Sequence, residues 1–145
     1  MRRALLIAAL STGAIGPAHA YDFEPLKPLD VQSVDKALLN DIYGAWEIRD
    51  KSGKRRCRIE LQKGVAIGGY AIAVAPGCAK AFPVMDDIGA WRLQENWTID
   101  LVDALRKTRV RFETPDNRYV ALGEKADIAG MAELVKLPPS NPAKK

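Results

Sequence analysis

The segment from residue 56 to residue 61 reads Arg56-Cys57-Arg58-Ile59-Glu60-Leu61. Charged and apolar side chains alternate along it, which is the period of a β-strand with one face in a core and the other in water. An amphipathic helix would instead repeat its apolar residues every three or four positions. The segment therefore predicts a strand that directs Cys57, Ile59 and Leu61 inward.

The same alternation recurs further along the chain. Trp91 and Leu93 flank a charged residue, and so do the apolar neighbours of Asp100 and Arg111. Such strands have a dry face and a wet face, as in antiparallel sheets that cover a single core. We expect the charged residues on the wet faces to be Arg92, Asp100, Arg109 and Arg111.

Turn residues interrupt the alternation every eight to twelve positions, which is typical of a sandwich or barrel of short antiparallel strands. Between Tyr43 and Leu137 we expect about eight such strands, and hence an all-β domain. The predicted turns are Lys51–Lys54, Lys63–Gly64, Ala75–Gly77, Gln94–Asn96 and Thr114–Asn117.

Residues 1–20 have the three parts of an export signal. Arg2 and Arg3 precede an apolar run, and small residues lie at the expected cleavage point after Ala20. The apolar run is too short to span a bilayer. We therefore expect a signal peptide at 1–20, a mature chain that begins at Tyr21, and a periplasmic or secreted protein without a membrane span.

The two ends of the mature chain have no sustained period. Residues 21–33 contain Pro25 and Pro28 and predict an extended N-terminal arm. Residues 138–145 contain three prolines and predict a disordered tail. The domain itself is expected over residues 34–137.

A short helix is expected at the start of this domain. Apolar residues recur there at helical spacing, and Ser33 stands where it could cap the first turn. The helix would run for about two turns. Its apolar positions are Val34, Ala37, Leu38 and Ile42.

The composition excludes most enzymatic functions and argues against nucleic-acid binding. His19 is the only histidine of the 145 residues and leaves with the leader. The mature chain then lacks the usual general base, imidazole metal ligand and nucleophile partner. Without Arg2 and Arg3 it has 20 basic and 18 acidic side chains, too even a balance for a nucleic-acid-binding face. We expect no catalytic residue, no metal, no cofactor and no nucleic-acid partner.

The mature chain has two cysteines, Cys57 and Cys78. In an oxidising compartment they are expected to form one disulfide. The bond would close a loop of about 20 residues and stabilise the fold by about 3 kcal/mol. A pair of free buried thiols is the alternative.

An ordered set of motifs spans roughly residues 34–137. In order, the motifs are Gly44-Ala45-Trp46, Cys57-Arg58-Ile59-Glu60-Leu61, Cys78, Trp91-Arg92-Leu93, Ile99-Asp100-Leu101, Phe112, Tyr119, and Gly130 followed by Leu134-Val135-Lys136-Leu137. Together they resemble the alkaline proteinase inhibitor family, which comprises exported bacterial inhibitors of serralysin-type zinc metalloproteases. An outer-membrane lipoprotein group shares the domain. No single motif is diagnostic, because Gly-x-Trp at a first strand also occurs in lipocalins.

The resemblance implies an eight-stranded antiparallel lipocalin-like β-barrel, closed at one end by Trp46 and stapled by a Cys57–Cys78 bond. It also implies an N-terminal arm that lies in the protease's substrate cleft near the catalytic zinc, with the barrel rim as a second contact area. In this chain the arm residues would be Tyr21, Asp22, Phe23, Glu24, Pro25 and Leu26.

The chain departs from the family pattern at the arm. Family inhibitors begin with small residues and have a shorter stretch before the tryptophan, whereas here Tyr21 is bulky and twenty-four residues separate it from Trp46. Both differences bear on how the arm's terminus approaches the zinc. We expect a monomeric, non-enzymatic inhibitor of a secreted serralysin-type zinc metalloprotease. The alternatives are a lipocalin-like carrier of a small molecule and a structural envelope protein.

Overall fold

The computed structural model describes residues 23–122, 128 and 130–139. The expected signal peptide, the arm residues Tyr21 and Asp22, and residues 140–145 of the expected tail lie outside the described residues. In the part that is described, no helix is both long and apolar enough to cross a membrane.

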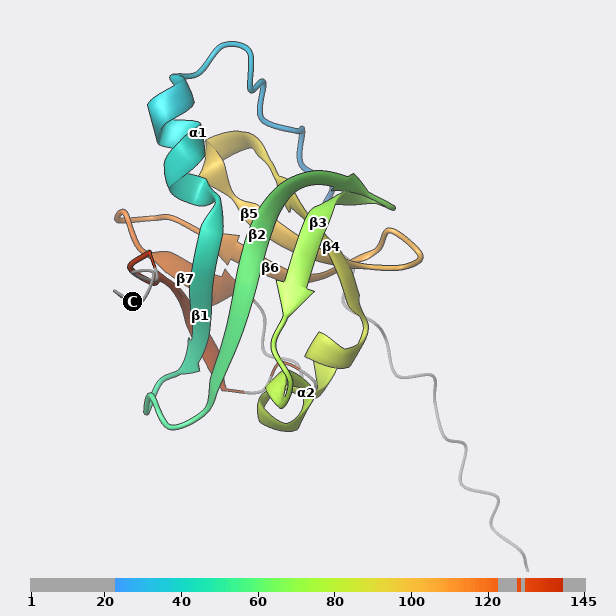
Figure 1. Ribbon diagram of the computed structural model, residues 1–145, viewed down its shortest axis with the longest axis vertical. Coiled ribbons are helices and arrows are strands. Elements are labelled where there is room, and N and C mark those ends of the chain that lie inside the picture. Colours follow the sequence, from blue (N-terminus) through green and yellow to red (C-terminus); the bar gives the residue numbers. More distant parts are fainter. Residues whose placement is uncertain (1–22, 123–127, 129, 140–145) are drawn as a thin grey trace, which may run out of the picture.

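Eight antiparallel strands form a closed barrel (Figure 1). Each strand pairs with the next in sequence, and the last pairs with the first, so the sheet closes on itself. The predicted all-β, eight-stranded, lipocalin-like barrel is thereby confirmed. The strands are β1 Gly44–Asp50, β2 Arg56–Ala66, β3 Gly69–Val74, β4 Ile88–Leu93, β5 Ile99–Asp103, β6 Thr108–Glu113, β7 Tyr119–Leu122 and β8 Met131–Lys136.

The alternating segment 56–61 lies in β2 and faces inward as predicted. Cys57, Ile59 and Leu61 are buried, whereas the three charged residues between them are exposed. In the β1–β2 register Trp46 lies opposite Ile59, so both strands direct apolar side chains into one core. Large apolar side chains fill the barrel, and the most deeply buried include Ile48, Trp91, Ile99, Leu101, Val110 and Phe112.

Helix α1, Lys36–Ile42, precedes the barrel and confirms the expected short helix. The predicted cap and part of the apolar face are wrong. Asp35 caps the helix by accepting a hydrogen bond from the Ala37 amide. Ser33 belongs to the preceding turn, where its amide and its hydroxyl both donate to the Asp30 carbonyl. The helix starts two residues later than expected, and it packs on the barrel through Leu39 and Ile42, which are buried, while Leu38 is 52% exposed.

Three shorter helices of the described residues lie between barrel strands. Helix α2, Cys78–Ala81, and the 3-10 helix η1, Pro83–Asp86, connect β3 to β4 and bury Phe82, Val84 and Met85. A second 3-10 helix, η2, Glu95–Trp97, connects β4 to β5. In Figure 1, α2 lies at the end of the barrel opposite α1.

The predicted turn at Lys63–Gly64 is wrong, because β2 continues through both residues to Ala66. The hairpin turns instead at Ile67 and Gly68, where Gly68 has a φ of +90°. Four of the five predicted turns fall between strands or at the short helix η2. The hairpin is therefore longer than expected, and its tip carries apolar residues.

Candidate functional site

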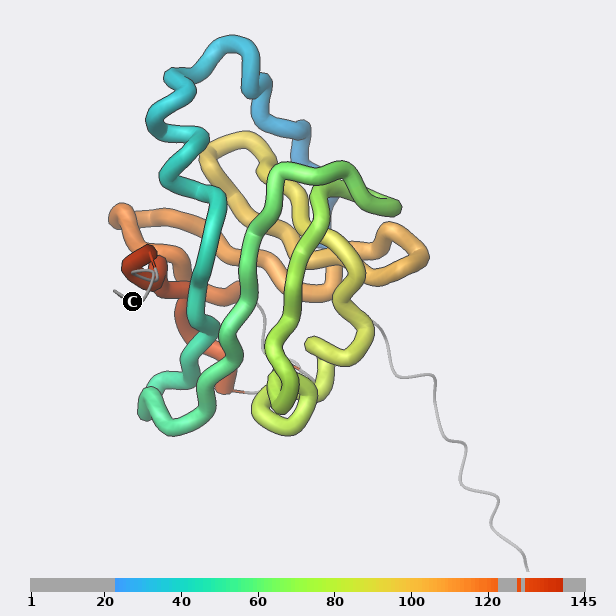
Figure 2. Tube along the Cα trace, in the orientation of Figure 1, coloured from blue at the N-terminus to red at the C-terminus, as the bar shows by residue number. Residues whose placement is uncertain are grey.

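The N-terminal arm lies against the barrel as an added extended segment. The Leu29 amide donates to the Leu93 carbonyl at 3.1 Å, and the Glu95 amide donates to the Lys27 carbonyl at 2.7 Å. Between them Pro28 forms an antiparallel bridge with Gln94. From there the chain arches over the barrel end and turns back into α1, as the blue trace in Figure 2 shows. The arm's carboxyl-terminal half is therefore fixed to the end of β4.

Arg111 on β6 fixes the other described end of the arm. Its Nη1 donates to the Glu24 carbonyl at 2.9 Å, and its guanidinium lies 5.0 Å from the centre of the Phe23 ring. The same guanidinium forms a two-point ion pair with Asp100, at 2.7 Å from Nε and 2.8 Å from Nη2. Arg111 thus joins the arm to the barrel through one rigid planar group.

Asp100 is the centre of this polar cluster. It is completely buried, and Gln94 and Thr108 each donate a side-chain hydrogen bond to its Oδ2 at 3.2 Å. Asp100 and Arg111 lie directly opposite each other in the β5–β6 register. A buried carboxylate with a bidentate cation and two further donors is well satisfied.

The expected solvent exposure of Asp100 and Arg111 is wrong. Their exposed fractions are 0% and 5%, because the arm and the side chain of Gln94 cover the outer side of β5 and β6 at this point. An ion pair that would be weak in water is thereby placed in a dry environment. The arm shields the ion pair from water, and Arg111 of the ion pair anchors the arm.

The arm presents some of its predicted residues to solvent and turns others to the barrel. Glu24 and Pro25 are exposed, as are Lys27 and Pro28. Phe23 packs on Arg111. Leu26 is partly buried and lines a shallow hollow of about 230 Å³, whose other walls are Asn96, Thr98, Glu113, Thr114 and Pro115.

Beyond η2 the rim continues to Trp46, at the start of β1. Its Nε1 donates to the Ile42 carbonyl at 2.7 Å, and its ring meets Tyr119 edge-on at 5.5 Å. Tyr119 donates its hydroxyl to the Trp97 carbonyl at 2.8 Å, and burial raises its pKa to about 12. Trp46 is therefore packed beneath α1 and held in place by its hydrogen bond to Ile42, the last residue of that helix.

Two residues of η2 have backbone conformations that L-amino acids rarely adopt. Asn96 has a φ of +57° and Trp97 a φ of +59°, and the latter is costly for a bulky side chain. Two hydrogen bonds hold this backbone in place. The Tyr119 hydroxyl donates to the Trp97 carbonyl, and the Thr114 hydroxyl donates to the Asn96 carbonyl. Backbone strain of this kind gathers at functional sites. Next to it is an open hollow of about 470 Å³, lined by Leu38, Asp41, Ile42, Trp97, Thr114, Asn117 and Tyr119.

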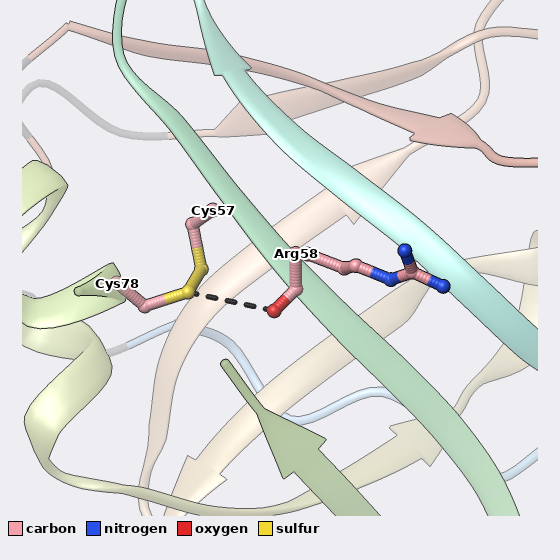
Figure 3. The surroundings of a disulfide bond; sticks show 3 residues. All are labelled: Cys57, Arg58 and Cys78. Carbon is pink, nitrogen blue, oxygen red and sulfur yellow. Dashed lines mark hydrogen bonds between the residues drawn. A yellow bond between two sulfur atoms is a disulfide. The ribbon is translucent and has the colours of Figure 1, made fainter. Parts of the chain in front are cut away.

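The disulfide lies at the opposite end of the barrel. Cys57 and Cys78 are bonded and buried, which confirms the predicted pair and removes the alternative of free thiols. Figure 3 shows the bond between β2 and the first turn of α2, with the Cys78 Sγ 3.5 Å from the Arg58 carbonyl oxygen. The bond attaches the α2–η1 segment to the barrel wall.

The comparison with known protein families decides the assignment. Residues 37–131 match the model of the family described as Protease inhibitor Inh, which is well over half of the chain. The chain belongs to this protease inhibitor family. The resemblance found in the sequence motifs is thereby confirmed. No curated protein matches the chain.

Membership of the Inh family makes a protease the partner class of this inhibitor domain. The matched range begins inside α1 and so leaves out the arm. Among the described residues, no group of three or more His, Cys, Asp or Glu side chains could hold a metal ion.

Sequence reasoning missed the Asp100–Arg111 cluster as part of the site. A signal was present, because opposite charges occupy the centres of two adjacent alternating strands. It was not sufficient, since only the path of the arm shows that the pair is buried.

Proposed function

We propose that this Inh-family chain is an exported, non-enzymatic inhibitor of a zinc metalloendopeptidase of the serralysin type, acting in the periplasm or the secreted fraction. Family membership supports the inhibitory role. The leader-like residues 1–20 support export. The zinc metalloprotease target follows from the motif resemblance and is the finer part of the proposal.

In the proposed mechanism residues 21–26 occupy the substrate cleft of the protease. The observation that carries this step is the anchoring of the Glu24 carbonyl by the buried Arg111. With Lys27 and Leu29 also hydrogen-bonded to the barrel, the arm's direction is set before the protease binds. A preorganised, proline-containing segment loses less conformational entropy on binding than a free one.

The rim beside the arm supplies the proposed second contact. It consists of η2, the turn Thr114–Asn117 and the exposed face of α1 that carries Leu38. The strained backbone of Trp97 and the open hollow support this assignment, because a concave apolar patch on a rigid frame suits a protein contact.

Shortening the arm tests the mechanism. A mature chain that begins at Pro25 lacks residues 21–24 but keeps the Lys27 and Leu29 hydrogen bonds to the barrel. We expect its inhibition constant against a serralysin-type protease to rise at least about a hundredfold, because two aromatic contacts are lost. The shortened chain should still fold, with a melting temperature modestly below that of the full mature chain, because Arg111 loses its contacts with Glu24 and Phe23 but keeps its ion pair with Asp100.

A chain that lacks residues 138–145 is the matched control and should inhibit fully. If the arm-shortened protein inhibits as well as the full chain, the arm mechanism is wrong while the family role stands. If the full mature chain inhibits proteases of other classes but no zinc metalloprotease, the proposed target class is wrong.

A further inference from the structure

Two turns with exposed apolar side chains lie side by side on the barrel. Val65 lies near the end of β2 and Ile67 in the β2–β3 turn that follows it, and the β5–β6 turn carries Leu105. Their exposed fractions are 88%, 72% and 88%. In Figure 1 both turns project together beyond the barrel wall, on the side where β3 and β4 lie. We call Val65, Ile67 and Leu105 the apolar tip.

The apolar tip is built on a rigid frame. A Cβ on Gly68 would lie 3.2 Å from the Cγ of Arg106, so the two turns are in close contact. Arg92 on β4 bridges them, because its Nε donates to the Gly68 carbonyl and its Nη2 to the Arg106 carbonyl. The three apolar side chains are therefore held at one place instead of moving with two independent loops.

The surroundings of the tip are basic. Residues 63–69 and 104–107 contain no acidic side chain, while Arg106 and Lys107 are exposed and Arg92 is partly so. Lys63 does not contribute to the tip, because its Nζ donates to Asn40 Oδ1 on α1 at 2.9 Å. Among the described residues, no carboxylate lies within ion-pair distance of Arg92 or Arg106. The acid next to the β5–β6 turn is Asp103, the last residue of β5, and it is buried. Burial would raise the pKa of its carboxyl, but hydrogen bonds from Lys107, Arg109 and Leu105 outweigh burial and lower that pKa.

Arg106 has a left-handed backbone conformation, which is unfavourable for an arginine. In the β5–β6 turn the Arg106 amide donates a hydrogen bond to the Asp103 carbonyl at 2.9 Å, and Arg106 has a φ of +67°. Three-residue hairpin loops of this kind favour glycine or asparagine at the left-handed position. An exposed arginine there breaks a local rule, and such breaks are expected where function compensates for them.

We propose that the apolar tip docks on the headgroup surface of an anionic phospholipid bilayer. Val65, Ile67 and Leu105 would enter the boundary between headgroups and acyl chains, and the surrounding Lys and Arg side chains would meet lipid phosphates. A protein partner fits less well. Leu and Val are under-represented among binding hot spots, Lys is depleted at interfaces, and the tip is convex and lacks aromatic residues.

Vesicle binding by the purified chain tests the proposal without any substitution. We expect the chain to sediment with vesicles of phosphatidylethanolamine and phosphatidylglycerol, to bind phosphatidylcholine vesicles much more weakly, and to lose anionic binding as salt is raised. Equal or negligible binding to both vesicle types would overturn the proposal. This result is independent of the inhibitory function, because no protease is present.

Three variants test whether the apolar tip is the contact. Serine at all three tip positions (V65S, I67S, L105S) should weaken binding to the anionic vesicles at least about tenfold, whereas Leu38→Ser, at an exposed apolar position on α1, should not change it. Arg106→Gly should raise the melting temperature by relieving the left-handed backbone and still weaken vesicle binding.

The outcomes separate a lipid contact from a protein contact. If the triple variant binds the anionic vesicles as well as the original chain, the tip is not the contact and the proposal is wrong. If the original chain ignores vesicles and the triple variant loses protease inhibition, the tip belongs to the protease interface, which equally refutes lipid docking. Full protease inhibition by a triple variant that no longer binds vesicles would support the proposal and leave the inhibitory mechanism untouched.

Discussion

Asp100 and Arg111 show how a charged pair on the outward side of a barrel becomes buried. The alternation along β5 and β6 predicts correctly that both side chains point away from Ile99, Leu101 and Phe112. The alternation cannot predict that the arm covers these side chains, because the arm residue that contacts Arg111 lies 87 positions earlier in the chain. Burial at this site is a property of the arm's path and not of the local sequence.

The substitution Asp100→Asn tests the energetic role of the pair. It leaves the shape nearly unchanged but removes the carboxylate that neutralises the buried Arg111 guanidinium. Breaking a buried pair from one side leaves an uncompensated charge, so we expect the free energy of unfolding to fall by roughly 3–5 kcal/mol. Urea denaturation at neutral pH measures the loss.

The exposed pair of Asp116 and Arg118 provides the matched control. Both side chains are more than half exposed, and the pair has the same residue types with one hydrogen bond at 3.0 Å. Asp116→Asn should therefore change the unfolding free energy by less than about 1 kcal/mol. Similar losses for the two variants would show that burial does not distinguish the pairs.

At the scale of the elements, the β2–β3 hairpin departs most from the sequence prediction. Lys63–Gly64 has turn composition, yet β2 runs through it. The position of the turn is set by the next strand pair. Gly69 lies so close to β4 that a Cβ there would be 2.3 Å from the Trp91 carbonyl oxygen. Gly64 and Gly69 look equivalent in the sequence, and only the contact between β3 and β4 distinguishes them.

Alanine substitutions at these two glycines should therefore have opposite consequences. Gly69→Ala forces β3 away from the β4 backbone, and we expect it to lower the free energy of unfolding by about 1–3 kcal/mol, as overpacking does. Gly64→Ala meets nothing nearer than the Ala71 Cβ at 3.9 Å and should be neutral or slightly stabilising. Thermal and urea melts of the two variants check the contrast, and a harmless Gly69→Ala would contradict the close approach.

For the whole molecule, the sequence predicts the barrel better than it predicts the site. Alternating strands, their turns and two cysteines are local signals, and together they indicate eight strands and one disulfide. The arm's docking on Arg111 and the meeting of two apolar turns are long-range contacts between segments that carry no mutual signal in one sequence. The residues that hold the candidate site in place were therefore beyond local pattern analysis.

The disulfide acts on the whole molecule because it constrains the unfolded chain. Cys57 and Cys78 are 21 positions apart, and opening that loop should lower the free energy of unfolding by about 3 kcal/mol. We expect chemical reduction and the double variant Cys57→Ala, Cys78→Ala to give similar losses in urea denaturation. The reducing agent should have no further effect on the double variant. An unchanged unfolding midpoint after complete reduction would show that the packing of α2 and η1 against the barrel, and not the bond, determines the stability of this end.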